Sequence, residues 1–204
     1  GIDNVFIGET AGCANTTGNR NVFLGSQAGR NTSNDNNVFI GYKSGCNNST
    51  GSNNIAIGLY AGQTSDTPNG NVNITGSNCI VMGNNNHTNA YIRIGWTVTS
   101  DIRDKHVFGS VPHGKDFLKG INPIKYSFKD RETDEITDET VRYGFSAQEI
   151  RELEGDDYII SRDMTEDRIG LTHEYLIPVL VNAVKELDAE VTALRARLET
   201  LEGQ

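Results

Sequence analysis

Ser100 and Lys105 are the residues whose types and spacing point most directly to chemistry. A serine hydroxyl is a weak nucleophile until a neighbouring base takes its proton, and a lysine serves as that base only when burial keeps its amine neutral. Both residues lie in one hexapeptide that also contains Asp101 and Arg103. Because a serine and a lysine at this spacing are common in proteins, the pair alone favours a turn serine and a solvated lysine over a catalytic site.

The hexapeptide lies between two halves of different composition. Residues 1–99 are rich in Gly and Asn, and their four acidic residues balance four basic ones, so residues 100–204 carry the whole formal net charge of -9. An acidic chain lacks the basic surface that binds phosphates, so we expect neither a nucleic-acid partner nor binding to an anionic membrane. We predict two domains, residues 1–99 and 100–204.

A short repeat fills most of the first half. An Asn, three mostly apolar residues and a Gly recur every 16 or 17 residues, beginning at Asn4. A fixed period of this kind is typical of a β-solenoid or β-helix, in which stacked coils bury apolar side chains against their neighbours. Within the first strand, Val5 and Ile7 point one way and Phe6 the other. We expect the aliphatic residues to face the core, and phenylalanines such as Phe6 to be covered by association of several chains.

No cofactor or metal site is expected from the sequence. Cys13, Cys46 and Cys79 are odd in number and form no C-x-x-C pair, so we predict free thiols. The Asn-rich runs are typical of solvated loops between coils. No apolar run approaches the roughly 20 residues of a membrane span. Gly1 opens directly into the repeat, which suggests a fragment of a longer chain rather than a signal peptide.

The second half reads as a small α+β module. We predict a short helix at residues 116–121, strands at 125–128 and 141–145, and a helix that begins at Ala147. A further strand pair is expected between residues 158–160 and 168–171. His113 and His173 are expected to be ordinary surface or cap residues, since no acidic partner or nucleophile is spaced to complete a triad.

The C-terminal segment has the clearest periodicity in the chain. Eight apolar residues are separated alternately by three and four positions, which predicts a coiled-coil helix over residues 174–202. They are Ile177, Leu180, Val184, Leu187, Val191, Leu194, Leu198 and Leu201. Val at one seam position with Leu at the other favours two-stranded parallel coils, so the heptads alone suggest a dimer.

Taken in order, these motifs resemble a known family. The hexapeptide, residues 121–128, residues 143–150 and the heptad helix are similar to the C-terminal intramolecular chaperone domain of phage endosialidases, tail fibres and neck appendages, a self-cleaving serine peptidase family. The repeats resemble the head repeats of trimeric autotransporter adhesins and the β stalks of phage fibres. That second resemblance implies a homotrimer.

The chaperone resemblance also implies a site. Cleavage would fall between Thr99 and Ser100, with Ser100 as nucleophile and Lys105 as general base. Four further residues of the matching motifs are candidates for supporting roles, and structural roles are at least as plausible for them. They are Asp101, Arg103, Gln148 and Glu149.

The expected function is an intramolecular chaperone that trimerises and folds its own N-terminal stalk and then cuts itself free. The parent would be a virion tail fibre or spike that folds in the host cytoplasm and binds a receptor on the host surface. The alternative is a structural or adhesive trimeric fibre tip, in which the C-terminal domain stays as a permanent cap and the Ser-Lys pair is inert. A glycan-degrading spike fits poorly, because the stalk lacks a convincing pair of carboxylates.

Overall fold

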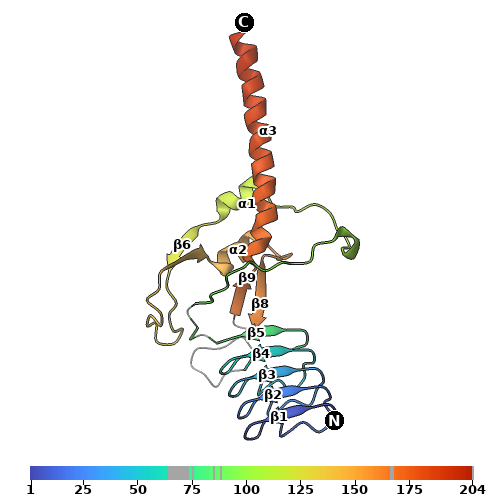
Figure 1. The fold of residues 1–204 in the computed structure, drawn as a ribbon. Coiled ribbons are helices and arrows are strands. Elements are labelled where there is room, and N and C mark those ends of the chain that lie inside the picture. Colours follow the sequence, from blue (N-terminus) through green and yellow to red (C-terminus); the bar gives the residue numbers. More distant parts are fainter. Residues whose placement is uncertain (64–73, 75, 85, 88, 166–167, 204) are drawn as a thin grey trace. The chain divides into compact units, whose positions relative to one another are not determined.

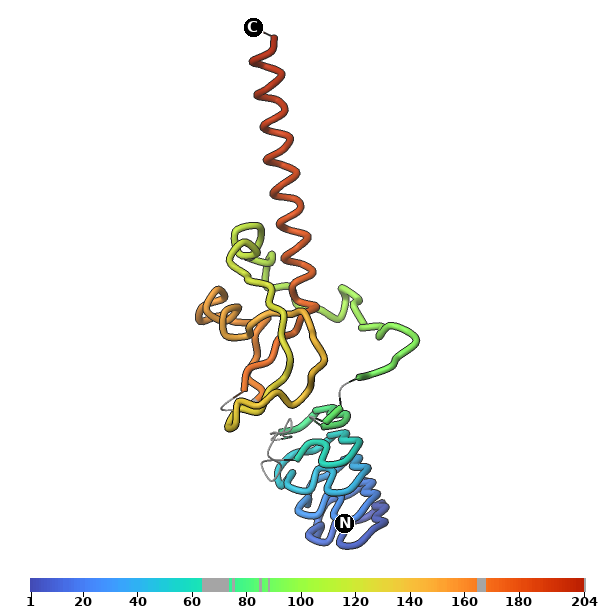
Figure 2. Tube along the Cα trace, turned by 90° about the vertical axis from the view of Figure 1, so that its left-hand side faces the viewer, coloured from blue at the N-terminus to red at the C-terminus, as the bar shows by residue number. Residues whose placement is uncertain are grey.

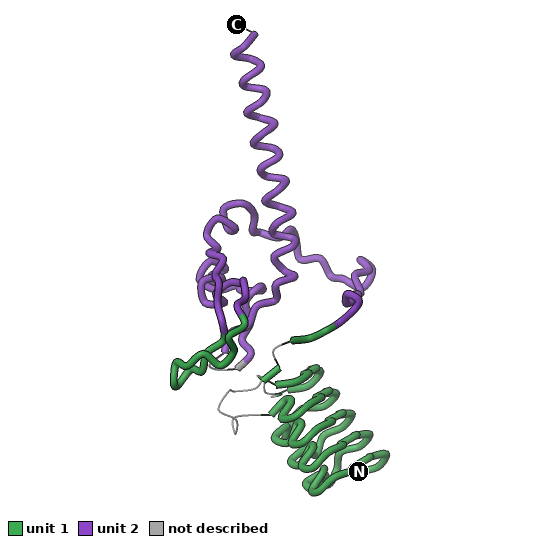
Figure 3. Tube along the Cα trace, turned by 60° about the vertical axis from the view of Figure 1, so that its left-hand side comes forward, with its two compact units in different colours: residues 1–91, 128–140 green, residues 92–127, 141–204 purple. Residues whose placement is uncertain are grey.

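The computed structural model describes residues 1–63, 74, 76–84, 86, 87, 89–165 and 168–203. The chain divides into two compact units, residues 1–91 with 128–140 and residues 92–127 with 141–204 (Figure 3). The functional boundary between residues 99 and 100 stays a prediction.

The first unit contains a parallel β-solenoid built from very short strands (Figures 1 and 2). Each coil contributes one three-residue strand to a five-stranded sheet in sequence order. The strands are β1 (Val5–Ile7), β2 (Val22–Leu24), β3 (Val38–Ile40), β4 (Ile55–Ile57) and β5 (Ile80–Met82). Neighbouring strands pair in register, so that Phe6 aligns with Phe23 and Phe23 with Phe39. The predicted solenoid is confirmed.

The core of the solenoid is aromatic, contrary to our expectation. Phe23 and Phe39 are fully buried, whereas Val5 and Ile7 are 48% and 58% exposed, so the prediction that the aliphatic residues face the core is wrong. The Phe6 and Phe23 rings stack with centroids 4.8 Å apart, and those of Phe23 and Phe39 stack at 5.2 Å. These centroid distances are close to the strand spacing of a β-sheet, so one flat ring per coil fills the interior of the first three coils, and Ala56 and Val81 take that position in the next two.

The second glycine of each of the first three repeats is required by these rings. Gly29 has a φ of +55°, and a Cβ at that position would lie 2.6 Å from the Phe23 ring. Gly45 has the same relation to Phe39, at 2.5 Å. The glycine that follows the apolar triplet is therefore needed for two reasons: it allows the turn, and it leaves room for the phenylalanine ring.

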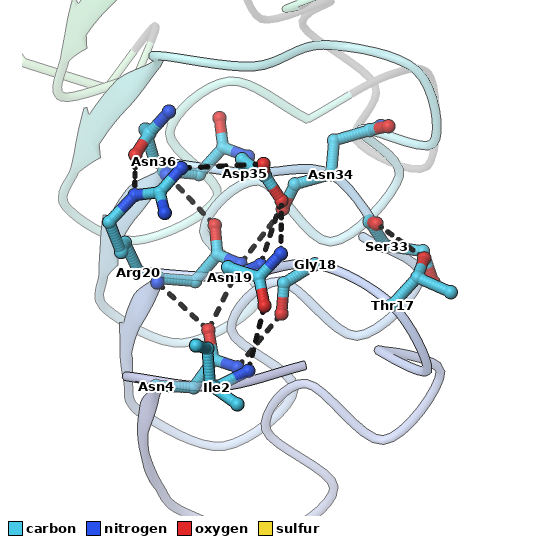
Figure 4. Close-up of polar contacts among 12 residues, drawn as sticks. Ile2, Asn4, Thr17, Gly18, Asn19, Arg20, Ser33, Asn34, Asp35 and Asn36 are labelled. Atoms are coloured by element: carbon cyan, nitrogen blue, oxygen red, sulfur yellow. Dashed lines mark hydrogen bonds and ion pairs between the residues drawn. The ribbon is translucent and has the colours of Figure 1, made fainter.

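Asparagine side chains satisfy the backbone where one coil passes to the next. Asn21 and Asn37 are buried, and each Oδ1 accepts a hydrogen bond from the amide of the Asn one coil further on, at 2.8 Å and 3.0 Å. At a nearby corner, the Asp35 carboxylate accepts the Asn19 amide and pairs with Arg20 (Figure 4). Because a buried unpaired amide is costly, these residues are structural parts of the coil.

The second unit is the expected mixed α/β module with a long final helix. Its elements are η1 (Ile102–Asp104), α1 (Lys115–Gly120), β6 (Pro123–Tyr126), β7 (Arg142–Phe145), α2 (Ala147–Glu154), β8 (Ser161–Thr165), β9 (Arg168–Leu171), η2 (His173–Tyr175) and α3 (Leu176–Glu202). Strands β6 and β7 pair antiparallel, as do β8 and β9. The core joins α2 to the first turns of α3 through Ile150, Leu176 and Val179.

Two predicted strands are displaced. Strand β6 begins two residues earlier than expected, at Pro123, because proline is tolerated as the first residue of a strand. The strand predicted at 158–160 starts instead at Ser161, and the Glu154 carboxylate accepts the amides of Ile159, Ile160 and Ser161 at 2.7 Å, 2.6 Å and 2.8 Å. Burial alone would raise the pKa of Glu154, but these backbone hydrogen bonds outweigh it and the net pKa lies below the usual range.

Helix α3 presents its heptad seam to solvent. The eight seam residues are between 43% and 67% exposed, whereas Leu176, Val179 and Ala183 pack on the module. The helix follows a one-turn η2 and begins at Leu176, two residues later than predicted. Thr172 makes no side-chain cap hydrogen bond. A single chain therefore leaves the whole seam uncovered.

The stacked rings predict a large local effect of truncation. Replacing Phe23 by Ala should lower the free energy of opening of the β2 and β3 amides by about 3–5 kcal/mol, because it leaves a cavity between two rings. Native-state hydrogen exchange measures this opening directly. Phe6→Ala is the matched control, since Phe6 is only partly buried and stacks on one described ring. Equal effects of the two substitutions would contradict the aromatic core.

Candidate active site

Ser100 and Lys105 are in direct contact. The chain is extended through Thr99, turns through η1 and brings the lysine back, so that Lys105 Nζ donates a hydrogen bond to Ser100 Oγ at 2.5 Å. The lysine amide also donates to the Ile102 carbonyl at 3.2 Å, which closes the turn. Five residues of local chain are thus enough to join a hydroxyl to an amine beside the predicted scissile bond.

Asp101 holds this turn in shape. Its carboxylate caps η1 by accepting the Arg103 amide at 2.9 Å, and it also accepts two hydrogen bonds from Arg103 Nε and one from a terminal guanidinium nitrogen. The Arg103 side chain, and then its backbone amide, hold the pKa of Asp101 below the usual carboxyl range. A lowered pKa means that the contact is complete at neutral pH and is lost only as the pH falls through that lowered value.

The site is open to solvent in the single chain. Ser100 and Lys105 are both exposed. A protonated lysine donates to the serine oxygen, whereas a general base has to accept the serine proton. The turn therefore provides proximity, and a further change of environment would be needed to favour the neutral amine.

Gln148 and Glu149 lie at the start of α2. Ser146 caps that helix by accepting the Glu149 amide at 3.3 Å, and its hydroxyl donates to Gln148. Among the described residues, no hydrogen bond or ion pair joins either side chain to Ser100 or Lys105, and Glu149 Oε2 is buried without a hydrogen-bond partner. Their supporting role stays a prediction.

His113 and His173, the two histidines considered as site candidates, make ring contacts. His113 stacks on Phe117 with centroids 4.1 Å apart, and His173 lies 6.2 Å from Phe145 in a tilted arrangement. Within the described part of the chain, neither is hydrogen-bonded to Ser100. The expectation that they are ordinary surface or cap residues stays a prediction.

Other classes of site lack a structural basis in the described residues. No group of three or more His, Cys, Asp or Glu side chains there is arranged to hold a metal ion. Cys13, Cys46 and Cys79 form no disulfide bond among the described residues. None of the described helices is both long and apolar enough to cross a membrane.

The sequence analysis missed the residues that fasten the segment after the hexapeptide to α3. Asn182 donates hydrogen bonds to the Val111 and His113 carbonyls at 3.0 Å and 3.1 Å. Glu186 accepts the Lys115 amide at 2.7 Å, and Glu190 forms an ion pair with the Lys115 ammonium. These three polar residues recur every four positions on one side of the helix, which was the available signal. These contacts join residues 111–115, which follow the hexapeptide, to α3.

Comparison with protein families found one match. Residues 100–159 match a family model described as chaperone of endosialidase and named Peptidase_S74. The chain carries an endosialidase-type chaperone domain. The match begins at Ser100 and supports a chaperone role in tail-fibre folding, while the family name indicates a self-cleaving peptidase. No curated protein and no solved structure matched the chain.

The cap at Asp101 gives a test of how the chaperone domain's turn is held. Asp101→Ala should slow cleavage at the predicted Thr99–Ser100 bond by about 5-fold, since a lost cap costs about 1 kcal/mol and the serine-lysine contact depends on it. The rate is measured by following the cleaved fragment by mass spectrometry. Asp104→Ala is the control, because Asp104 lies in the same turn and its described side chain makes no hydrogen bond. Equal rates for the two variants would contradict the bracing role.

Proposed function

We propose that residues 100–204 form an intramolecular chaperone that assembles the N-terminal solenoid and then releases itself by cutting between Thr99 and Ser100. The observation that carries the proposal is the contact between Ser100 Oγ and Lys105 Nζ at the first residue of the family match. Both reacting groups belong to the chain that is cut. The reaction is therefore a single turnover that depends on orientation rather than on binding a separate substrate.

The proposed chemistry is an acyl transfer followed by hydrolysis. The neutral Lys105 amine takes the Ser100 hydroxyl proton while Oγ attacks the Thr99 carbonyl carbon, and the proton passes to the Ser100 nitrogen as the peptide bond breaks. The product is an ester between the Thr99 carbonyl and Ser100 Oγ. Water then hydrolyses the ester, which leaves a Thr99 carboxylate and a Ser100 with a free amine and hydroxyl.

Assembly is the proposed trigger for this chemistry. Ser100 and Lys105 are exposed in the single chain. Neighbouring copies that cover the turn would remove solvent from it, and desolvation favours the neutral form of an amine. Cleavage would then report that the stalk has assembled.

The α3 seam is the proposed site of first association. In a parallel coil with the helices in register, the heptad positions beside the seam place Glu190 opposite Arg195 of the next chain, and Arg197 opposite Glu202. Opposite charges at both places favour parallel copies in register. The number of chains, three, comes from the resemblance of the repeats, since the Val and Leu seam by itself favours two. Early association raises the local concentration of the stalk segments and sets their register.

The chaperone's client is the N-terminal solenoid of the same chain. Each coil contacts only the neighbouring coils, so a shift in register between chains would change the energy of the solenoid little. The register between chains therefore has to be set by another part of the molecule, the C-terminal domain. We place the parent protein in a virion, as a tail fibre or spike that folds in the host cytoplasm. Its receptor would lie on the host surface. Removal of the chaperone leaves the stalk without its folding template, so that unfolding is resisted kinetically.

Intact mass tests the proposed cleavage. After native assembly and then denaturation, the wild-type chain should give two fragments that meet between Thr99 and Ser100. Ser100→Ala and Lys105→Ala should each keep the full mass of 22.3 kDa, because one lacks the nucleophile and the other lacks the base.

The same experiment separates the two functions that the sequence allows. If all three proteins keep the full mass while they associate, the Ser-Lys pair is inert and the C-terminal domain is a permanent cap of a structural or adhesive fibre tip. Fragments of other masses would place the scissile bond elsewhere. Either result would overturn the assignment of Ser100 and Lys105.

A further inference from the structure

The solenoid carries two rows of aliphatic side chains on the outside of its strands. One row is formed by the first residue of each strand and the other by the third, in register along the sheet. The rows are Val5, Val22, Val38, Ile55 and Ile80, and Ile7, Leu24, Ile40, Ile57 and Met82. All ten are exposed or half-buried, and six are at least 39% exposed.

These side chains are not needed for the core of the coil. The interior is filled by the middle residue of each strand, with Phe23, Phe39 and Ala56 at 0% exposure. A coil that needed only a soluble outer face could carry Thr, Ser or Lys at the outer positions, as half-solvated strands usually do. Ten aliphatic residues in ten positions instead form one continuous apolar face.

The face is large and free of charge. Ten aliphatic side chains in two adjacent rows form a contiguous apolar patch of the kind that marks an interaction surface. The charged residues of the described solenoid lie outside both rows. They include Glu9, Arg20, Arg30, Asp35 and Lys43. The two rows therefore offer no charged side chain that could form an ion pair with a charged partner.

We propose that this aliphatic face is the surface through which copies of the chain pack together along the stalk. A partner has to match two apolar rows that repeat once per coil at the spacing of β-strands. A second copy of the two rows has the same repeat, the same absence of charge and the same apolar area. The inference rests on the homotrimer of the proposed function and specifies which face of the solenoid the copies bury.

The proposal replaces the earlier expectation about what association covers. Phe6, Phe23 and Phe39 stack inside the coil of one chain. Association buries the aliphatic residues on either side of them instead. Each copy would thus keep an aromatic core of its own, and an aliphatic core would form between copies.

Site-specific photocrosslinking tests the face in the full-length chain. The Ser100→Ala background keeps the chain whole, and p-benzoylphenylalanine is incorporated in place of Ile57 or, separately, of Ile7. After irradiation, a denaturing gel should show crosslinked dimers and trimers. The control probe replaces Ser49, an exposed residue outside both rows, and should give no crosslinked species. Molar mass is measured by light scattering before irradiation.

A charge placed in the rows supplies a second readout. Leu24→Asp should lower the crosslinking yield from the Ile57 probe by roughly tenfold or more, because the interface would have to bury an unpaired carboxylate. Thr16→Asp, at an exposed position outside the rows, should leave the yield unchanged.

The outcomes separate this inference from the proposed function. A sample with the mass of a trimer that crosslinks equally from Ser49, or not at all from Ile57 and Ile7, overturns the aliphatic face and leaves the trimer standing. A sample with the mass of a monomer overturns both. Crosslinks from the two row positions alone, reduced by Leu24→Asp, support the face.

Discussion

The apolar seam of α3 has no cover within a single chain, and this constraint organises the rest of the molecule. Eight aliphatic side chains along 27 residues of helix remain exposed, while the opposite side of the first turns is already packed on the α/β module. Exposed apolar surface of this extent is costly in water. The proposed association of copies of the chain would cover this apolar surface.

Polar contacts fasten the segment that follows the hexapeptide to one side of α3. Asn182 and Glu186 hold Val111 and Lys115 against the helix whose seam is proposed to associate. The turn is already formed by local hydrogen bonds from Asp101 and Arg103. What the single chain lacks is an enclosed environment around the lysine. This arrangement fits the proposal that cleavage follows assembly. The local turn already places the two side chains together, whereas desolvation of the lysine would come only from assembly.

Periodicity made much of the fold predictable. The 16- to 17-residue repeat predicts the solenoid and the 3-4 spacing predicts the long helix, because both patterns follow from the geometry of the backbone. The direction of side chains within each strand was not predictable in the same way. Alternation separates Val5 and Ile7 from Phe6 but does not state which side is the interior, and that depends on ring stacking along the coil.

The candidate site shows a similar division. The types and spacing of Ser100 and Lys105 pointed to a hydroxyl-amine pair, and the contact between them is local. The start of β8 could not be predicted, since it depends on Glu154 taking amides five and six residues ahead. The attachment of Lys115 to Glu190 joins residues far apart in sequence, which no local pattern reports.

The central claim, that assembly triggers cleavage, is tested most directly by following oligomer mass and chain mass together during refolding. Native mass spectrometry of one refolding reaction, sampled over time, measures both quantities. The cleaved N-terminal fragment, residues 1–99, is expected only within trimers. Leu187→Asp, which places a charge in the seam, should leave an uncut monomer, whereas Thr192→Asp on the same helix should assemble and be cleaved normally. An N-terminal fragment that forms while the chains are still monomeric, or normal cleavage of the monomeric Leu187→Asp protein, would contradict the proposed trigger.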